Sequence, residues 1–393
     1  MVYSGKQFSF VSNFGHGVND LFWFVFPLVL PLMLTTFGLS YGQAGGILTL
    51  YLLIIAVLSF LFGKLSDRSS KWAILGPGFF AASAGLILCG FMPNLGLLIT
   101  FIIITAVGVS TFHPLMYASV DERTQLKKGN TFGKYEFWGF VAITTMFFIH
   151  GTLMKSVDWK QLLIITAAPG LIAAVIYTIG KPGPLPAEES NETPGAETGG
   201  TIPPRVFTLF LLSVLLRMLG TTATINFIPT YMALEVGMKS SLATYASGLF
   251  FLGGVAASIP AGKLSDKWGA FPTLNIAVLL MLPSIYILTL NVPYWLYGIS
   301  IFLFGMGSGA GHPAHIMIAS RLTNKMGTGQ IFGIIMAIMT LVSALSPILQ
   351  GLLADRISLA VAFRIFEIPL IASLVITIIL TKSEKLYVLA KQT

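Results

Sequence analysis

The chain alternates between long apolar runs and short polar segments over almost its whole length. A helix that spans a membrane needs about 20 consecutive, mostly apolar residues. Runs of about that length recur along the chain and predict twelve helices, at residues 8–36, 42–62, 72–91, 95–118, 131–154, 160–180, 206–233, 242–261, 271–290, 294–319, 330–353 and 358–380.

One polar segment, residues 181–205, is longer than the others. Its sequence is KPGPLPAEESNETPGAETGGTIPPR, and this Pro, Gly, Glu and Thr content favours a flexible linker over a packed element. We therefore expect an N-terminal six-helix bundle at 1–180, a cytoplasmic linker at 181–205, and a C-terminal six-helix bundle with a short tail at 206–393. The predicted fold class is an all-α integral membrane protein with twelve transmembrane helices in two bundles.

Several short motifs occur twice at nearly the same spacing. GKLSD occupies residues 63–67 and again 262–266, and a His-Pro pair occurs at 113–114 and 312–313, so both second copies lie 199 positions after the first. Phe-Gly at 132–133 returns 200 positions later, at 332–333. This internal repeat predicts two pseudo-symmetric halves, an arrangement in which parallel repeats rock around a site that lies between them.

Composition supports a membrane protein. Hydrophobic residues make up 55% of the chain and charged residues 10%, whereas a soluble domain carries about 25% charged residues. The single cysteine, Cys89, excludes a disulfide framework and a cysteine-based metal site. The net charge of +8 comes from Lys and Arg scattered over short loops, which argues against a nucleic-acid partner.

The distribution of Lys and Arg predicts the orientation. With the N-terminus in the cytoplasm, sixteen Lys and Arg fall in inside segments and four in outside loops. Cytoplasmic segments of membrane proteins carry such an excess. We therefore expect a multi-pass protein of the cytoplasmic (inner) membrane with both termini in the cytoplasm.

The segments GKLSDRSSKW and GKLSDKWGAF each follow the second helix of a half and resemble the G-x-L-x-D-R/K loop signature of the major facilitator superfamily. The resemblance covers essentially the whole chain and implies a transporter with the two-bundle fold. Within that superfamily, HGVND at 16–20 and GVSTFHP at 108–114 are similar to segments of the fosmidomycin-resistance-type exporters.

The repeated loop motif predicts a gate. Its glycines would let two helix ends approach closely, and its aspartates would face the amino end of the next helix or a basic side chain. Contacts of this kind, which exist in only one gate state, bias the gate by about 0.3–1 kcal/mol each. The alternative is a plain polar turn with a cap. The candidate gating residues are Gly63, Asp67, Arg68, Gly262, Asp266 and Lys267.

Ionisable residues at bilayer depth cost about 2.5–3.5 kcal/mol on insertion scales and need a reason to be there. The resemblance implies that the first, fourth, seventh and tenth helices line a central cavity. On the first helix, His16 and Asp20 are four residues apart and share one face, with Asn19 beside it. They are candidates for proton coupling or solute contact, with a polar brace between helices as the alternative.

The fourth and tenth helices carry the repeated histidines, His113 and His312, each followed by a proline that is expected to kink its helix. His315 lies three residues beyond His312, on roughly the same face. We interpret all three as solute-binding groups or proton acceptors. The alternative is a structural histidine that is hydrogen-bonded to a neighbouring helix.

Arg217 is the strong cation of the seventh helix and cannot be deprotonated at ordinary pH. It would hold an anionic solute or neutralise an acid such as Asp20. Lys134 and Glu136 begin the fifth helix. Glu136 would pair within the bundle or with a gate residue, or else the two residues form an interfacial pair in which the lysine reaches toward water.

A tetrahedral metal set could be drawn from His312, His315, His113 and Asp20, but the sequence shows no supporting second-shell pattern, and we expect no metal and no cofactor. The chain contains no H-E-x-x-H, no G-x-S-x-G and no Gly-Lys-Ser/Thr phosphate loop, so we expect no enzyme.

The function predicted from these features is proton-coupled secondary transport of a small anionic or amphiphilic solute by alternating access. We expect efflux of a drug or metabolite by an antiporter that works as a monomer. The expected partners are the solute, protons and the lipid bilayer. The alternative is a proton-coupled symporter that takes up an organic anion.

Overall fold

The structure is a computed structural model that describes residues 2–124, 128–183, 204–320 and 328–392. Most of the expected linker, residues 184–203, lies outside the described residues. The first-half helices are α1 (Gly5–Phe37), α2 (Tyr41–Ser66), α3 (Lys71–Phe91), α4 (Leu95–Val109), α5 (Phe112–Asp121), α6 (Lys128–Leu153) and α7 (Trp159–Ile179).

The second half repeats this order. Its helices are α8 (Pro204–Thr230) with the π-helical turn η1 (Tyr231–Glu235), α9 (Ser240–Trp268), α10 (Ala270–Leu288), α11 (Tyr294–Ser320), α12 (Thr328–Arg356), α13 (Leu359–Ile365) and α14 (Glu367–Gln392).

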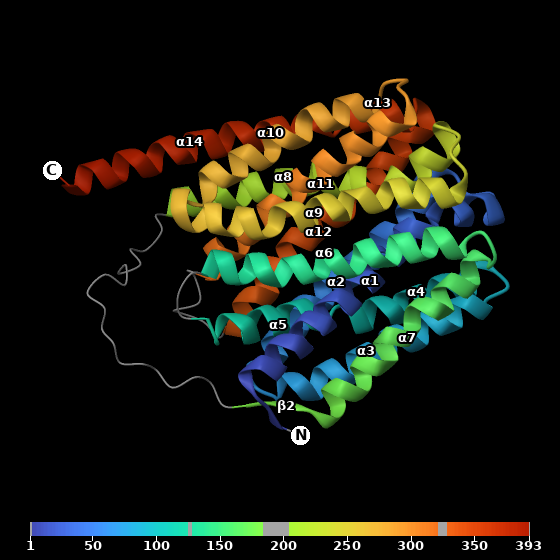
Figure 1. Cartoon of the computed structure of the whole chain (residues 1–393), viewed down its shortest axis with the longest axis horizontal. Coiled ribbons are helices and arrows are strands. Elements are labelled where there is room, and N and C mark those ends of the chain that lie inside the picture. The colour runs from blue at the N-terminus through green and yellow to red at the C-terminus, as the bar shows by residue number, and fades with distance from the viewer. Residues whose placement is uncertain (1, 125–127, 184–203, 321–327, 393) are drawn as a thin grey trace.

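Twelve spans result when α4 and α5, α8 and η1, and α13 and α14 are each counted as one. Within the described residues, ten helices are long and apolar enough to cross a membrane, and α6 and α11 complete the two sets of six. The expected fold class is therefore confirmed. In Figure 1 the first-half helices (blue to green) lie together in the lower part and the second-half helices (yellow to red) in the upper part.

Short polar or glycine-containing sequences mark where these helices begin and end. Ser40 starts α2 with a capping box, in which its hydroxyl accepts from the backbone N–H of Gln43 while the Gln43 side chain accepts from the Ser40 N–H. Asp158 and Gln161 do the same for α7. Gly38 ends α1 at φ 63°, a left-handed conformation that favours glycine.

The His-Pro repeat behaves differently in the two halves. In the first half the helix is interrupted between Val109 and Phe112, because Pro114 has no N–H to donate to the carbonyl of Ser110. The Ser59 hydroxyl donates to this freed carbonyl at 3.2 Å. In the second half α11 is continuous through Pro313, so the helix is interrupted in only one of the two repeats, and the kink expected at Pro313 stays a prediction.

The halves meet along two long helix pairs, α2 with α12 and α6 with α9. Both pairs approach backbone to backbone at the loop-motif end: a Cβ on Gly333 would lie 3.1 Å from the Cα of Gly63, and a Cβ on Gly133 3.3 Å from the Cα of Gly262. Gly63 and Gly262 thus lie where the backbones of the two halves come close, and their part in gating stays a prediction.

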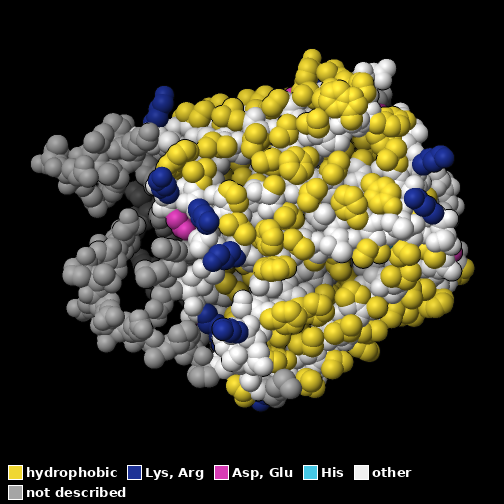
Figure 2. All heavy atoms as spheres, viewed as in Figure 1, with side chains coloured by type: hydrophobic (Ala, Val, Ile, Leu, Met, Phe, Trp, Pro, Cys, Tyr) yellow, Lys and Arg dark blue, Asp and Glu magenta, His cyan; other side chains and the backbone are white. Residues whose placement is uncertain are grey.

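The surface agrees with a membrane location. Figure 2 shows a broad band of hydrophobic side chains on this face, with Lys and Arg gathered at its two ends. At one end, the two-residue strand β1 (Val2–Tyr3) pairs in parallel with β2 (Lys181–Pro182). The start of the chain and the start of the linker segment therefore lie side by side.

Candidate functional site

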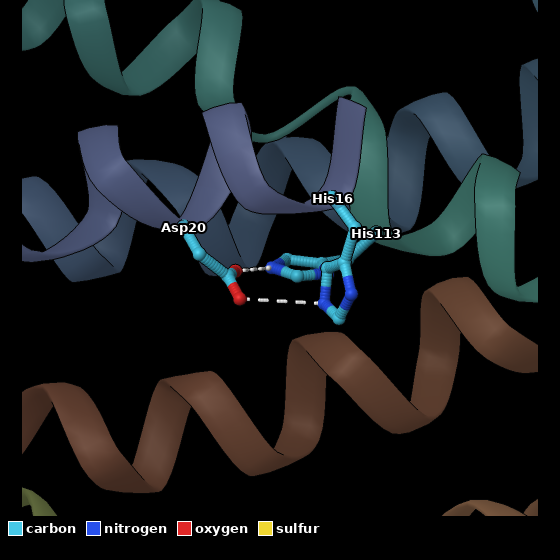
Figure 3. A group of neighbouring side chains, drawn as sticks. All are labelled: His16, Asp20 and His113. Atoms are coloured by element: carbon cyan, nitrogen blue, oxygen red, sulfur yellow. Dashed lines mark ion pairs between the residues drawn. The ribbon is translucent and has the colours of Figure 1, made fainter. Parts of the chain in front are cut away.

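Two histidines converge on one aspartate between α1 and α5 (Figure 3). Nε2 of His16 lies 3.4 Å from Oδ2 of Asp20, and Nε2 of His113 lies 3.2 Å from Oδ1 of the same carboxylate. His16 and His113 are 1% and 7% exposed, and the Asp20 side chain is 14% exposed. The pairing within α1 follows from its four-residue spacing, and the break before α5 places His113 at the start of a helix.

The hydrogen bond behind His16 restricts where its proton can be. Nδ1 of His16 lies 3.1 Å from the carbonyl oxygen of Tyr135 and must donate, because a carbonyl only accepts. In a neutral His16 the Nε2 atom would then be a bare acceptor that faces a carboxylate oxygen. Two acceptors attract only when a proton lies between them, so the His16–Asp20 contact is a place where a proton can be held.

Two further polar atoms beside this pair have no hydrogen-bond partner within the described residues, Nδ1 of His113 and Nδ2 of Asn19. Asn19 is 1% exposed. An unsatisfied buried polar group costs about 1–3 kcal/mol. A solute that supplies hydrogen-bonding groups to these two atoms would recover that cost.

Aromatic rings enclose the three residues. The ring of Tyr135 stacks on His16 with centroids 4.1 Å apart, and the ring of Tyr117 stacks on His113 at 5.4 Å. Because Gly139 of α6 has no side chain, there is room beside it for these three residues, since a Cβ there would lie 2.6 Å from Oδ2 of Asp20. We call His16, Asp20 and His113 the histidine–aspartate site.

Tyr117 links this site to a second buried acid and to the other half. Its hydroxyl donates to Oε1 of Glu136 at 2.7 Å, and its ring lies 6.0 Å from that of Phe332 in α12. Glu136 therefore pairs within the bundle, one of the two readings of the sequence. Lys134, on the same helix, is exposed.

Arg217 lies in the second half, at the contact between α8 and α11. It is 1% exposed, Nη1 lies 3.5 Å from the carbonyl oxygen of Ser308, and a Cβ on Gly311 would lie 2.6 Å from its guanidinium carbon. The described ion pairs of Asp20 go to the two histidines. The side chains of His312 and His315 lie outside the described residues.

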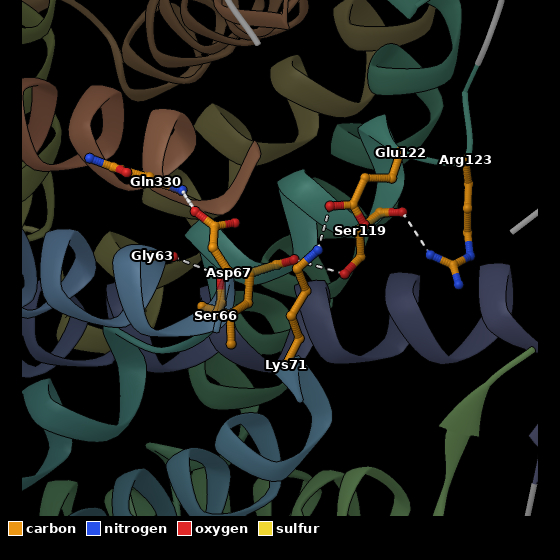
Figure 4. Close-up of polar contacts among 9 residues, drawn as sticks. Gly63, Ser66, Asp67, Lys71, Ser119, Glu122, Arg123 and Gln330 are labelled. Carbon is orange, nitrogen blue, oxygen red and sulfur yellow. Dashed lines mark hydrogen bonds and ion pairs between the residues drawn. The ribbon is translucent and has the colours of Figure 1, made fainter. Parts of the chain in front are cut away.

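The loop motifs act across the two halves (Figure 4). A carboxylate oxygen of Asp67, at the end of α2, accepts from the backbone N–H of Gln330 in the first turn of α12 at 2.8 Å. Its repeat mate Asp266 accepts from the N–H of Asn130 in the first turn of α6, also at 2.8 Å. The sequence led us to expect the next helix or a basic side chain as the partner, and these two hydrogen bonds instead join each aspartate to a helix of the opposite half.

The flanking cations of the motif, Arg68 and Lys267, are exposed. A nearby ion pair, Lys71 with Glu122 at 2.5 Å, stays within the first half. The two aspartate caps, and not this pair, are therefore the contacts that must break when the halves separate at this end.

At the other end of the α2–α12 pair the roles are exchanged, and a carboxylate of α12 caps α2. Asp355, near the end of α12, accepts from the backbone N–H groups of Tyr41 and Gly42 at 2.8 and 2.9 Å and from the Ser40 hydroxyl at 2.8 Å. Each helix of this pair thus carries a carboxylate that caps the amino end of the other. Both ends of the pair are closed in the structure.

Neutralising the motif aspartates is expected to open the loop-motif end. Asp67→Asn and Asp266→Asn keep an acceptor but lose the charge that favours a helix amino end, worth about 0.3–1 kcal/mol at an exposed site. Each variant should raise the fraction of molecules open at that end by about two- to fivefold. Pulsed EPR distances between labels on the motif ends of α2 and α12 measure this. Glu122→Gln, which breaks a pair within one half, should leave the distances unchanged, and an equal shift there would contradict the assignment.

Several residues of the site were not predicted. Tyr117 is four residues from His113 on the same helix face, a spacing that could have indicated it. Tyr135, Gly139 and Asp355 act on residues more than 100 positions away, and no local pattern marks them.

The histidine–aspartate site could also be considered for a metal ion, because its ligand atoms lie within 4.8 Å of one another. This set differs from the one considered from the sequence, which relied on His312 and His315. Since the imidazole and carboxylate atoms already contact one another, a shared proton satisfies them without a metal ion.

Comparison with known proteins places this arrangement in a family context. The model of the Major Facilitator Superfamily matches residues 13–213 and 209–391. Among curated proteins, the MFS-type transporter YceJ of Bacillus subtilis (strain 168) is 26% identical over 267 residues, which covers 66% of each chain. The riboflavin transporter RibZ of Clostridioides difficile (strain 630) is 24% identical over 334 residues, or 71% of this chain and 73% of RibZ.

Solved structures show the same fold. The proton:xylose symporter XylE, bound to 6-bromo-6-deoxy-D-glucose, superposes with a TM-score of 0.71 at 14% identity, covering 93% of this chain and 94% of XylE.

Proposed function

Because the chain belongs to the Major Facilitator Superfamily, it is a secondary transporter and not an enzyme, and we propose that it couples solute movement to protons through the histidine–aspartate site. The solute is small and anionic or amphiphilic, and it moves by alternating access. One observation carries the proposal: Asp20 lies between two buried imidazoles, and the contact of His16 Nδ1 with a carbonyl leaves its Nε2 facing the carboxylate, where a proton can lie between the two.

A proton site suits coupling because its occupancy changes with access. Imidazole and carboxylate groups exchange protons in the physiological pH range when their surroundings alternate between two aqueous compartments. A difference of one pH unit supplies about 1.4 kcal/mol per proton. That driving force supports about a tenfold concentration ratio of solute when one proton moves per solute.

The site has a structural route to the gate. Tyr117 stacks on His113, bonds to Glu136 and contacts Phe332, which lies two residues from Gln330 at the Asp67 cap. A change of protonation that shifts Tyr117 therefore acts on the same helix that Asp67 holds. In this mechanism, protonation and the cap bias one two-state movement of α12.

Whether the solute and the proton move in the same direction or in opposite directions depends on which groups the solute contacts. A solute that donates hydrogen bonds to the Asp20 oxygens competes with the proton, and the two must then move in opposite directions. This is the antiport that we favour, with efflux from the cytoplasm across the inner membrane, as the similarity to fosmidomycin-resistance-type exporters suggests. An anion held by Arg217 would instead attract a proton, which favours the alternative, uptake by symport.

A panel of solutes in proteoliposomes with an imposed pH gradient tests the proposal. An internal pH dye reports proton movement as each solute leaves vesicles that were loaded with it. Under antiport the interior of vesicles loaded with solute becomes more acidic as the solute leaves, and under symport it becomes more alkaline. A transported solute that causes no pH change at all would refute proton coupling. We expect a monomer to suffice, with both termini on the cytoplasmic side.

Arg217→Gln is expected to weaken the binding of anionic solutes by about 10- to 100-fold while neutral solutes keep their affinity. The reason is the loss of hydrogen bonds to a charged group, which are worth about 1.5–3 kcal/mol. Solute-induced shifts of the melting temperature in detergent measure both classes. Arg217→Lys serves as the control that keeps the charge and should lose less. Equal weakening of both classes would show that Arg217 supports the α8–α11 contact and not the solute.

A further inference from the structure

A small pocket lies between the ends of α1, α5 and α6. It has a volume of about 220 Å³, and hydroxyl and amide side chains of Ser9, Ser12, Asn13, Thr124 and Thr131 contribute to its lining, as do the cations Arg123 and Lys134. It lies at the end of the molecule that carries the loop motifs, since α5 ends there and α6 begins there. Such a lining suits an anionic group with several oxygen atoms.

A larger apolar groove of about 730 Å³ adjoins this pocket. It runs between α1, α6 and α7, and Ser9 and Asn13 line both cavities. Its walls include Phe10, Trp138 and Ile149, whose side chains are 69%, 49% and 49% exposed. Because these side chains face outward, the groove opens toward the hydrocarbon of the bilayer and not toward water.

The groove is long enough for an acyl chain. Its apolar lining on α1 extends from Phe10 to Leu21, which is about 16 Å at a rise of 1.5 Å per residue. On α6 the lining continues to Ile149, four residues before that helix ends. Half of a hydrocarbon core of about 30 Å is about 15 Å, so an acyl chain that starts beside Ser9 would have apolar walls along its whole path through its leaflet.

The charges around the pocket select the headgroup. Within the described residues, Arg123, Lys134 and Lys6 form no ion pair, and Lys6 lines the groove beside Ser9. The guanidinium of Arg123 donates to the carbonyl oxygens of Ser119 and Gly183 and lies 4.4 Å from the centroid of the Phe8 ring. Burial lowers the pKa of Arg123 from its ordinary value, yet arginine stays protonated. The charge of the adjacent Glu122 acts on Arg123, but the Glu122 carboxylate is paired with Lys71 and the hydrogen bonds of Arg123 go to neutral carbonyls, so Arg123 can hold an anion.

From this geometry we propose that the pocket and groove form a binding site for one anionic phospholipid of the leaflet at the loop-motif end. Arg123 and Lys134 hold the phosphate, and an acyl chain lies along α1 between α6 and α7. Tyr135, which stacks on His16, lines the same pocket, so the headgroup would rest against the shell of the histidine–aspartate site. This inference does not depend on the proposed transport activity.

Native mass spectrometry of the purified full chain with added lipids tests the site. We expect phosphatidylglycerol to bind, and phosphatidylcholine with the same chains to bind at least about fivefold more weakly. Lys134→Gln should weaken phosphatidylglycerol about fivefold, the effect of one cation near a membrane surface. Lys263→Gln, an exposed lysine at the same end but in the second half, should change nothing. Thr145→Trp, at an exposed groove position, should reduce binding of both lipids.

Each alternative outcome overturns part of the assignment. Equal binding of the two lipids would show that the pocket does not select an anionic headgroup. Unchanged phosphatidylglycerol binding by both Lys134→Gln and Arg123→Gln would show that these cations do not hold the phosphate. Full phosphatidylglycerol binding by Thr145→Trp would show that no chain occupies the groove. Melting curves of the variants separate these results from misfolding, and none of the measurements requires transport.

Discussion

Replacing Asp20 with asparagine is expected to abolish accumulation driven by a pH gradient. The amide is nearly the same size and can still form hydrogen bonds with His16 and His113, so the packing should survive. It cannot take up and release a proton at ordinary pH. With a gradient of one pH unit, the ratio of solute concentrations across a proteoliposome membrane should be about 10 for the wild type and about 1 for Asp20→Asn.

The control for this variant is Asp158→Asn. Asp158 caps α7 at the far end of the first half, where asparagine is an equally good cap. It should keep the full ratio. Exchange of labelled for unlabelled solute at equal pH should persist in Asp20→Asn, because binding and alternation do not need the proton. Gradient-driven accumulation by Asp20→Asn at the wild-type ratio would show that the proton is carried elsewhere, and Glu136 would be the next candidate.

The fold was largely predictable because its signals are local. Each span is a mostly apolar run of about the length that a membrane requires. The repeat predicted two halves, since GKLSD and His-Pro return together after 199 positions. What the repeat could not predict is its own asymmetry. The same His-Pro pair interrupts the helix in one half, where Ser59 satisfies the freed carbonyl, and leaves α11 continuous in the other.

The candidate site was predictable only in part. The i, i+4 spacing predicted the contact between His16 and Asp20, because helical geometry alone sets it. The approach of His113 depends on how α5 is rotated against α1, which packing decides. The hydrogen bond from His16 to the Tyr135 carbonyl joins residues 119 positions apart and uses a backbone atom, which has no sequence signature.

The gate shows the same division between local and distant information. The sequence indicated that the motif aspartates would cap a helix, since carboxylates are stabilised at amino ends. It pointed to the next helix or a basic side chain, and not to a helix of the opposite half. The structure pairs Asp67 with α12 and Asp266 with α6, and it adds Asp355 at the opposite end of the α2–α12 pair. Because both ends of this pair are closed together, alternating access requires each end to open and reclose in turn.

Gly45→Val is therefore expected to block transport by preventing closure at the Asp355 end. A Cβ on Gly45 would lie 2.1 Å from the carbonyl oxygen of Pro347, a backbone atom that cannot move aside by rotation of a side chain. Overpacking of this kind costs about 1–3 kcal/mol, so states closed at that end should become about 5- to 150-fold rarer. Solute exchange should fall by a similar factor, and EPR distances between labels on the Asp355 ends of α2 and α12 should lengthen.

Gly46→Val supplies the matched control, because it adds the same side chain one residue further along the same helix. Its nearest contact would be a side-chain methyl of Ile348 at 3.9 Å, an ordinary van der Waals distance. Both variants replace glycine with valine in α2, so helix propensity changes equally and only the helix contact differs. Transport should be retained in Gly46→Val and lost in Gly45→Val. If both variants transported equally, α2 and α12 would not need to meet at this end, and closure there would have to rest on the α6–α9 pair, where Thr152 and Tyr245 share a hydrogen bond of 2.8 Å.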